Sequence, residues 1–167
     1  MEASEEFWML RKTLADVHEH RVSNVLVRSW QSGDESAWLY IHQAADSLNV
    51  FDESTFQNEF DSDPQVLAQR QVYAVLDGNR LIGTATAWFP EEGVNPTLGR
   101  IHWVAVLPSW QGRGVGRALV SEALTRLAAL GYSAAYLSTS QLRKPAISLY
   151  HGLGFEPVDR PELMNKL

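Results

Sequence analysis

The sequence of 167 residues contains no cysteine. Disulfide bonds, thiolate metal sites and a cysteine nucleophile are therefore excluded, and the composition is compatible with a reducing cytoplasm. No apolar run approaches the ~18 residues of a membrane-spanning helix, and the acidic start of the chain, residues 1–6, is unlike a signal peptide. We therefore expect a soluble, cytoplasmic protein that has no membrane partner.

Positive charge is also scarce, because 14 Lys and Arg face 20 Asp and Glu and the formal net charge is −6. A general nucleic-acid surface would need clustered cations, so nucleic acid is not an expected partner and a cationic small molecule is the better match. The hydrophobic content of 45% suits one compact domain, predicted over residues 21–167. Phe7, Leu10, Leu14 and Val17 recur at helical spacing and predict a helical extension over residues 1–20. That helix could cover the domain's own edge or contact a second copy in a homodimer.

The order of predicted elements defines the fold class. Strands are expected at 22–28, 71–76, 81–89, 99–107 and 132–139, and helices from 32–35 onward, near 52–60, over 114–130 and after Pro145. The polar turn at residues 77–80 joins two of these strands as a hairpin. A strand, helix and strand over 101–139 imply a parallel pair with a right-handed crossover. The expected fold is therefore α/β, with a mixed, mostly antiparallel central sheet and one parallel β-α-β crossover.

Three glycines follow the strand predicted at 99–107. Gly112, Gly114 and Gly116 let backbone N–H groups turn toward one point without Cβ atoms in the way. The helix that begins there adds its partial positive charge, and Arg113 and Arg117 add full charges. These residues predict a cradle for a pyrophosphate, although a plain strand-to-helix turn would use the same glycines. Neither the dinucleotide pattern nor the P-loop pattern fits their spacing.

At this point the chain resembles a known family. The segment Gln111-Gly112-Arg113-Gly114-Val115-Gly116 matches the Gln/Arg-x-x-Gly-x-Gly/Ala signature of the GNAT N-acetyltransferase superfamily. A second segment, Ala146 to Phe155, is similar to the superfamily's helix that carries Ala-Ile-x-Leu-Tyr and ends in Gly-Phe. The sequence departs from the pattern at Arg143, where many members place an asparagine. The resemblance implies an acyl-CoA N-acyltransferase fold.

The resemblance also implies that acetyl-CoA is the cosubstrate and that no metal takes part. Pantetheine would run along the strand at Val104, Ala105 and Val106, with its amides paired to backbone groups. The pyrophosphate would lie on the cradle, formed by Gln111, Gly112, Arg113, Gly114, Val115, Gly116 and Arg117. Plain core packing by the two valines is compatible with this, because side chain and backbone do different jobs.

Two residues are candidates for proton transfer. Tyr150 matches the superfamily's usual acid, and a phenol with an ordinary pKa of about 10 keeps its proton at neutral pH. Packing of its ring at an interface is the alternative. His102 lies on the predicted strand and titrates in the range a base needs. Arg100, His102, Val104 and Val106 would alternate onto one face, so His102 could equally be a structural histidine.

The segment between the first strand and the hairpin usually lines the acceptor site in the superfamily. Here it contains acids and aromatic residues: Asp52, Glu53, Glu59, Asp61, Asp63, Trp38, Tyr40, Phe51 and Phe56. We therefore expect an N-acetyltransferase that transfers an acetyl group directly, in a ternary complex, to a primary amine of a small cationic acceptor or of a peptide. A solvated acidic surface is the alternative for this segment. A non-catalytic acyl-CoA sensor or regulatory subunit is the alternative function.

Overall fold

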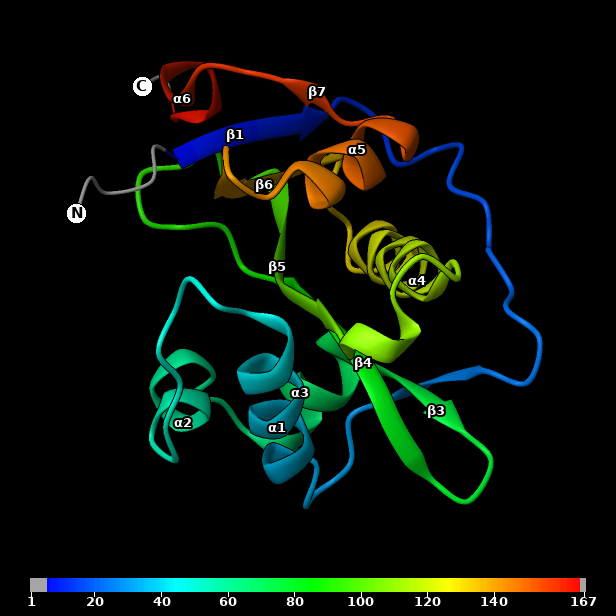
Figure 1. Cartoon of the computed structure of the whole chain (residues 1–167). Coiled ribbons are helices and arrows are strands. Elements are labelled where there is room, and N and C mark those ends of the chain that lie inside the picture. Colours follow the sequence, from blue (N-terminus) through cyan, green and yellow to red (C-terminus); the bar gives the residue numbers. More distant parts are fainter. Residues whose placement is uncertain (1–5, 166–167) are drawn as a thin grey trace.

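The computed structural model describes residues 6–165, which form a seven-stranded sheet in the order β2-β3-β4-β5-β6-β1-β7 (Figure 1). The strands are β1 (Glu6–Arg11), β2 (Leu26–Ser29), β3 (Gln71–Leu76), β4 (Arg80–Trp88), β5 (Leu98–Val106), β6 (Ala134–Ser140) and β7 (Glu156–Pro157). The β5–β6 pair is parallel, and the other neighbours are antiparallel. The prediction of a mixed sheet with one parallel crossover is confirmed.

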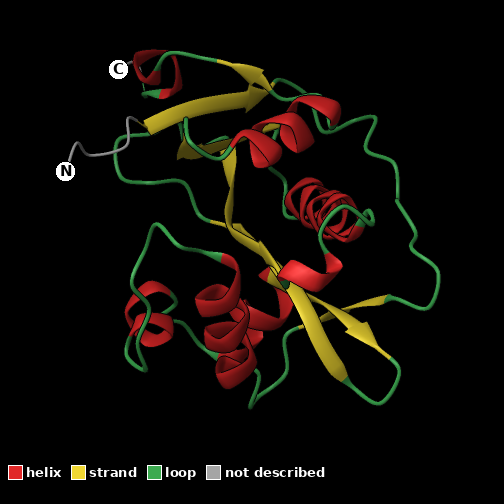
Figure 2. Ribbon diagram, viewed as in Figure 1, coloured by secondary structure: helices red, strands yellow, loops and turns green. Residues whose placement is uncertain are grey.

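Helices cover both faces of the sheet (Figure 2). Those in the first half of the chain, α1 (Glu35–Ala45), α2 (Thr55–Glu59) and α3 (Pro64–Arg70), lie on one face. The crossover helix α4 (Val115–Ala129) and helix α5 (Lys144–Gly152) lie on the other, and the chain also has a 3₁₀ turn at Pro108–Trp110 and a short helix α6 (Arg160–Leu163). Among residues 6–165, no helix combines the length and apolar character that a bilayer crossing requires.

Hydrophobic clusters pack on both faces of the sheet. On the α4 side, Leu119, Leu124 and Leu127 are almost completely buried in the main hydrophobic cluster. On the α1 side, Trp38 is fully buried at the centre of an aromatic cluster. Phe60 meets the Trp38 ring edge-on at a centroid distance of 5.5 Å. Edge-to-face packing of this kind adds specificity to apolar burial, so the two cores fix the sheet from both sides.

The predicted N-terminal helix is wrong over its described part, because Glu6–Arg11 form strand β1 inside the sheet. β1 pairs with β6 on one edge and with β7 on the other. Met9 packs into the main hydrophobic cluster, and Trp8 packs on the opposite face into a third, smaller cluster with Leu98 and Leu163. A strand covered on both faces has a continuous apolar run rather than an alternating pattern, and helical spacing within such a run is coincidental. Residues 1–5, the rest of the acidic start, lie outside the described residues.

Smaller differences concern short elements. Helix α3 was not predicted, although Asp63 caps it by accepting a hydrogen bond from the Val66 backbone N–H at 2.9 Å and Pro64 occupies its first turn. β7 and α6 were also not predicted. By contrast, α4 ends as expected before Gly131, whose φ of +94° is the left-handed conformation common after a helix end.

Gly99 on β5 provides a test of how closely α4 approaches the sheet. A Cβ at this position would lie 2.5 Å from Leu127 Cδ2 and 3.0 Å from Leu127 Cγ. Because Leu127 is completely buried, it has no space to move into. We predict that Gly99→Ala lowers the free energy of unfolding by about 1–3 kcal/mol in urea titrations.

The control for this prediction is a double-mutant cycle with Leu127→Ala. The single Leu127→Ala change leaves a cavity and costs about 2–5 kcal/mol. In the double variant the new methyl group occupies part of that cavity, so the combined loss should be smaller than the sum of the two single losses. Strict additivity would show that the two residues are not in contact.

Candidate active site

The two parallel strands in the middle of the sheet separate after a short paired stretch. β5 and β6 pair over Leu98–Arg100 and Ala134–Tyr136 only. Beyond that stretch, the remaining halves of both strands line pockets instead of each other. An opening between two strands exposes unpaired backbone groups, and these can bind an extended ligand as an additional strand would.

A bulge in β5 determines which residues face each side of this opening. Thr86 pairs with His102, whereas Thr84, two residues away, pairs with Ala105, so β5 has one extra residue between the pairs. Trp103, inside the bulge, has a φ of +48°. Directly paired residues share a face, so His102 and Ala105 point to the α1 side.

The predicted alternation is therefore wrong beyond His102. Val104 and Val106 lie on the α4 side, where Val106 Cγ2 would be 3.8 Å from a Cβ on Gly116. No local feature of the sequence predicts the bulge. Its extra residue exchanges the faces to which the following side chains of β5 point. As a result, the candidate base and the two valines face opposite sides of the sheet.

A pocket of about 630 Å³ lies between β5, the glycine-rich turn and α5. Its lining includes most of the predicted cofactor residues: Val104, Ala105, Val106, Gln111, Gly112, Gly114, Gly116 and Arg117. The Val115 side chain is buried in the main core, so it has only its backbone N–H to offer a ligand. Arg113 lies beside the neighbouring pocket, with its guanidinium 4.8 Å from the centre of the Trp110 ring.

The three glycines of the turn have different roles. Gly112 and Gly114 have φ values of +76° and +87°, a conformation that favours glycine, and Gly114 is the N-cap of α4. Gly116 has an ordinary backbone, but a Cβ there would lie 3.2 Å from Leu149 Cδ2 on α5. The first two glycines therefore shape the turn, and the third permits close packing of α4 and α5.

Backbone groups of β5 point into the opening. The Leu107 N–H donates to Ile82 O on β4 at 2.8 Å, so Leu107 bonds toward β4 and Val106 toward the opposite edge. There the Val106 carbonyl accepts a hydrogen bond from Gln111 Nε2 at 2.9 Å. An incoming amide would find this carbonyl at the wall of the pocket.

A second pocket, of about 420 Å³, lies on the other side of the opening, between β5, β6 and the end of α1. It is lined by charged and hydroxyl side chains that include Glu59, Arg100, His102, Ser138 and Ser140. The two pockets share part of their lining, namely Asp46, Val104, Arg143, Ala146 and Tyr150. These shared residues form the junction of the two pockets, the place where a donor in one and an acceptor in the other would meet.

Tyr150 is almost completely buried at the junction, 7% exposed. Burial raises the pKa of its phenol to about 12, and the positive charge of Arg143 acts in the opposite direction. The phenol therefore keeps its proton well above neutral pH. Its ring packs edge-on against Phe155, at a centroid distance of 5.9 Å, which fixes the direction of the hydroxyl group.

His102 lies in the second pocket with a carboxylate partner. Its Nε2 is 3.4 Å from Glu59 Oε2. Burial lowers the pKa of His102, and Glu59 partly offsets this effect. The hydrogen bond from His102 is the main cause that lowers the pKa of Glu59. The pair therefore consists of a neutral imidazole and an ionised carboxylate at neutral pH, the protonation state that a base requires.

Arg143 and Asp46 tie the start of α5 to the end of α1 across the junction. Arg143 Nη2 donates to Asp46 Oδ1 at 2.7 Å. The same carboxylate accepts hydrogen bonds from the backbone N–H groups of Leu48 and Asn49, at 2.8 Å and 3.2 Å, and from Asn49 Nδ2 at 2.9 Å. The anchor of the arginine is thus rigidly held.

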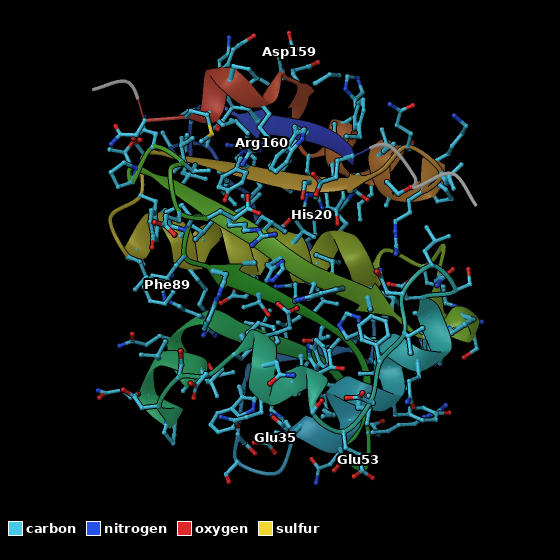
Figure 3. The ribbon with its side chains drawn as sticks, turned by 90° about the vertical axis from the view of Figure 1, so that its left-hand side faces the viewer. His20, Glu35, Glu53, Phe89, Asp159 and Arg160 are labelled. Atoms are coloured by element: carbon cyan, nitrogen blue, oxygen red, sulfur yellow. The ribbon has the colours of Figure 1, made fainter. Side chains whose placement is uncertain are left out.

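The acidic, aromatic segment predicted to line the acceptor site contributes little to the second pocket. Of its acids, only Glu59 lines the second pocket. Asp52 and Asp63 are exposed and bond to their own loops, and Figure 3 shows Glu53 at the end of the molecule opposite Asp159. The aromatic residues Trp38, Phe51 and Phe56 are buried in the second core instead, and Tyr40 is exposed.

Sequence reasoning missed the contribution of Asp46 and treated Arg143 only as a departure from a pattern. The two residues are 97 positions apart, and no local signal links them. The sequence places Arg100 on the strand and indicates no role for it, but its side chain lines the second pocket. Within residues 6–165, no group of three or more His, Asp or Glu side chains is arranged to hold a metal ion.

Residues 27–155 match the acetyltransferase (GNAT) family, and the chain belongs to this family. Over 162 residues it is 33% identical to a mycothiol acetyltransferase of Pseudarthrobacter chlorophenolicus, covering 90% of this chain and 49% of that protein. The chain spans about half the length of the curated relatives it matches.

Solved structures show the same fold. A GCN5-related N-acetyltransferase from Sphaerobacter thermophilus superposes with a TM-score of 0.75 at 21% identity, over 94% of this chain and 50% of that one. A phosphinothricin acetyltransferase from Sinorhizobium meliloti, in complex with AcCoA, gives a TM-score of 0.67 at 22% identity, over 80% and 75%.

A second buried histidine, His42 on α1, adjoins the site without lining either pocket. Its ring lies 4.2 Å from that of Trp38, between centroids, and burial lowers its pKa to about 3. In the unfolded chain the pKa returns to about 6.5, so the unfolded state binds the proton more readily. The stabilisation that neutral His42 provides is complete above pH 6.5 and is lost as the pH falls toward 3.

Between pH 7 and pH 5, we predict that the unfolding free energy of the wild-type protein falls by about 2 kcal/mol more than that of His42→Phe. The difference develops between pH 6.5 and pH 5, at about 1.36 kcal/mol for each pH unit. Urea titrations at both pH values measure the difference. Phenylalanine keeps the stacking on Trp38 and removes the titration. Equal losses in the two proteins would show that His42 is not the buried group responsible.

Proposed function

We propose that the protein is an acetyl-CoA-dependent N-acetyltransferase that acts by direct transfer in a ternary complex. The junction of the two pockets is the observation that carries this proposal. Direct transfer requires that the thioester and the amine meet in one enclosed place, beside an acid and a base. Tyr150 lies at that junction and His102 lies in the wall of the second pocket.

In this proposal acetyl-CoA occupies the larger pocket. Its pyrophosphate lies on the turn at Gly112 and Gly114, where N–H groups at the start of α4 and the charge of Arg117 favour an anion. Its pantetheine amides bond to backbone groups of Val104 and Val106 in the opening between β5 and β6. The Gln111 side chain would have to release the Val106 carbonyl, or share it, when that amide arrives.

The acceptor occupies the smaller pocket and presents a primary amine to the thioester carbonyl. His102 accepts the proton that the nitrogen loses, and Glu59 holds the imidazole and stabilises its charged form. Tyr150 protonates the departing sulfur. The lining has carboxylates of Glu6, Asp46 and Glu59, guanidinium groups of Arg100 and Arg143, and the hydroxyls of Ser138, Thr139 and Ser140. Such a wall favours a small, polar amine with several hydrogen-bonding groups over a simple polycation.

The test is release of coenzyme A from acetyl-CoA across a panel of primary amines, including mycothiol-related amines because of the relatives' names. With thiol-free amines a thiol reagent reports coenzyme A cleanly, since the chain has no cysteine. Acceptors that carry a thiol of their own are followed by chromatographic measurement of coenzyme A. We expect turnover with at least one polar amine. Tight acetyl-CoA binding without turnover on any amine would support a sensor instead, and no binding would contradict the donor site.

The acid is tested with Tyr150→Phe, which keeps the ring against Phe155 and removes the hydroxyl. A general acid contributes about 10²- to 10⁴-fold, so we predict a loss of kcat in this range. The dissociation constant of acetyl-CoA and the melting temperature should stay near wild type. Retention of more than about half of kcat, with chemistry rate-limiting, would contradict the role of Tyr150.

The base is tested by the pH dependence of kcat/KM. Because burial lowers the pKa of His102, its basic form is present at neutral pH. The rise of kcat/KM with pH that is due to His102 should therefore lie below pH 6.5. Glu59 opposes that shift, so Glu59→Gln should move the limb to still lower pH. His102→Gln should abolish the limb and leave only the rise due to the amine substrate. An unchanged profile in His102→Gln would show that another group is the base.

A further inference from the structure

Arg143 occupies the junction of the two pockets and takes no part in the proton transfers of His102 and Tyr150. Its side chain is 29% exposed and lines both pockets. One guanidinium nitrogen, Nη2, bonds to Asp46. The other N–H groups of the guanidinium make no further hydrogen bond to a side chain or backbone within residues 6–165, so they remain available to a ligand at the junction.

The phenol proposed as the acid is too weak to protonate the sulfur while the carbon–sulfur bond is breaking. Burial raises the pKa of Tyr150 to about 12, whereas a free thiol has a pKa of about 8.5. A proton that moves from the phenol to the thiolate therefore moves uphill. The departing sulfur therefore carries negative charge for a time, and Arg143 lines the same junction as Tyr150 with N–H groups that no group within residues 6–165 occupies.

We propose that Arg143 is a further catalytic residue, whose guanidinium stabilises the negative charge on the coenzyme A sulfur as the thioester breaks. This inference rests on the proposed function. Asp46 holds the guanidinium in place before the substrate arrives, so its positive charge needs no rearrangement to act on the sulfur.

The transfer step balances with these residues. The amine nitrogen forms a bond to the acetyl carbon, and one of its protons passes to His102. The carbon–sulfur bond breaks, and its electron pair goes to the sulfur, beside the Arg143 guanidinium. The sulfur then takes the proton of Tyr150, and exchange with solvent returns a proton to the phenol and removes one from His102. The products are the N-acetylated amine and coenzyme A.

The proposal is tested on the bound product, without turnover. Ultraviolet absorbance of the thiolate gives the pKa of the thiol of coenzyme A bound to the protein, which itself contributes no thiol. The same titration with desulfo-coenzyme A corrects for ionising tyrosines. In wild type we expect the pKa of the bound thiol to lie below 8.5, the ordinary value for a thiol.

Arg143→Asn is the decisive variant. Residue 143 is the N-cap of α5, where asparagine is favoured, so the variant should fold. We expect the pKa of the bound thiol to rise by about one unit, a tenfold change in ionisation, and kcat to fall about tenfold or more. Arg143→Lys should retain most of the effect. Arg80→Gln, which removes the same charge outside both pockets, should have none.

The outcomes separate the two proposals. An equal thiol pKa in wild type and Arg143→Asn, with coenzyme A bound to both, overturns the role of Arg143 and leaves the proposed function intact. Loss of the lowered thiol pKa in Arg143→Lys, which keeps a positive charge at the junction, would contradict stabilisation of the sulfur by charge. Failure of wild-type protein to bind coenzyme A overturns the proposed function and this inference with it.

Discussion

The separation of β5 from β6 after Arg100 and Tyr136 is the constraint on which the rest of the structure depends. A parallel pair that continued to the ends of both strands would satisfy its backbone groups and leave no room between them. Because pairing stops, both pockets lie along the gap between β5 and β6. The carbonyl of Val106 points into the larger pocket. Helix α4 places the glycine-rich turn beside this gap, and helix α5 places Tyr150 there.

The bulge in β5 distributes the functions of one strand between two faces. Before it, His102 points to the α1 side, where Glu59 approaches. After it, Val104 and Val106 point to the α4 side, and their backbone groups border the larger pocket. Without the extra residue, His102 and the valines would share a face, and the proposed base would compete with the proposed donor for the same space. The positive φ of Trp103 is the local cost of this arrangement.

The parts of this site that a sequence can predict are those made by neighbours along the chain. Gly112 and Gly114 predict the turn, and the helical pattern that ends in Gly-Phe predicts the helix that carries Tyr150. What escapes prediction depends on pairing between distant segments: the bulge opposite Thr84 and Thr86, and the Asp46–Arg143 bridge. β1 was mistaken for a helix because of its local sequence. Its apolar run fits a helical period as well as it fits a strand buried on both faces.

The net charge of −6 does not indicate the electrostatic field at the pockets, because that field depends on nearby groups. Many acids lie far from the junction, on exposed loops such as that of Asp52, where water screens them. The larger pocket has one carboxylate in its lining, Asp46, and Arg143 is bonded to it. Arg117 and the N-terminus of α4 therefore face that pocket without an unpaired acid beside them. An anionic donor can bind to a protein of the same overall sign, because the field at the pocket is set by the groups that line it.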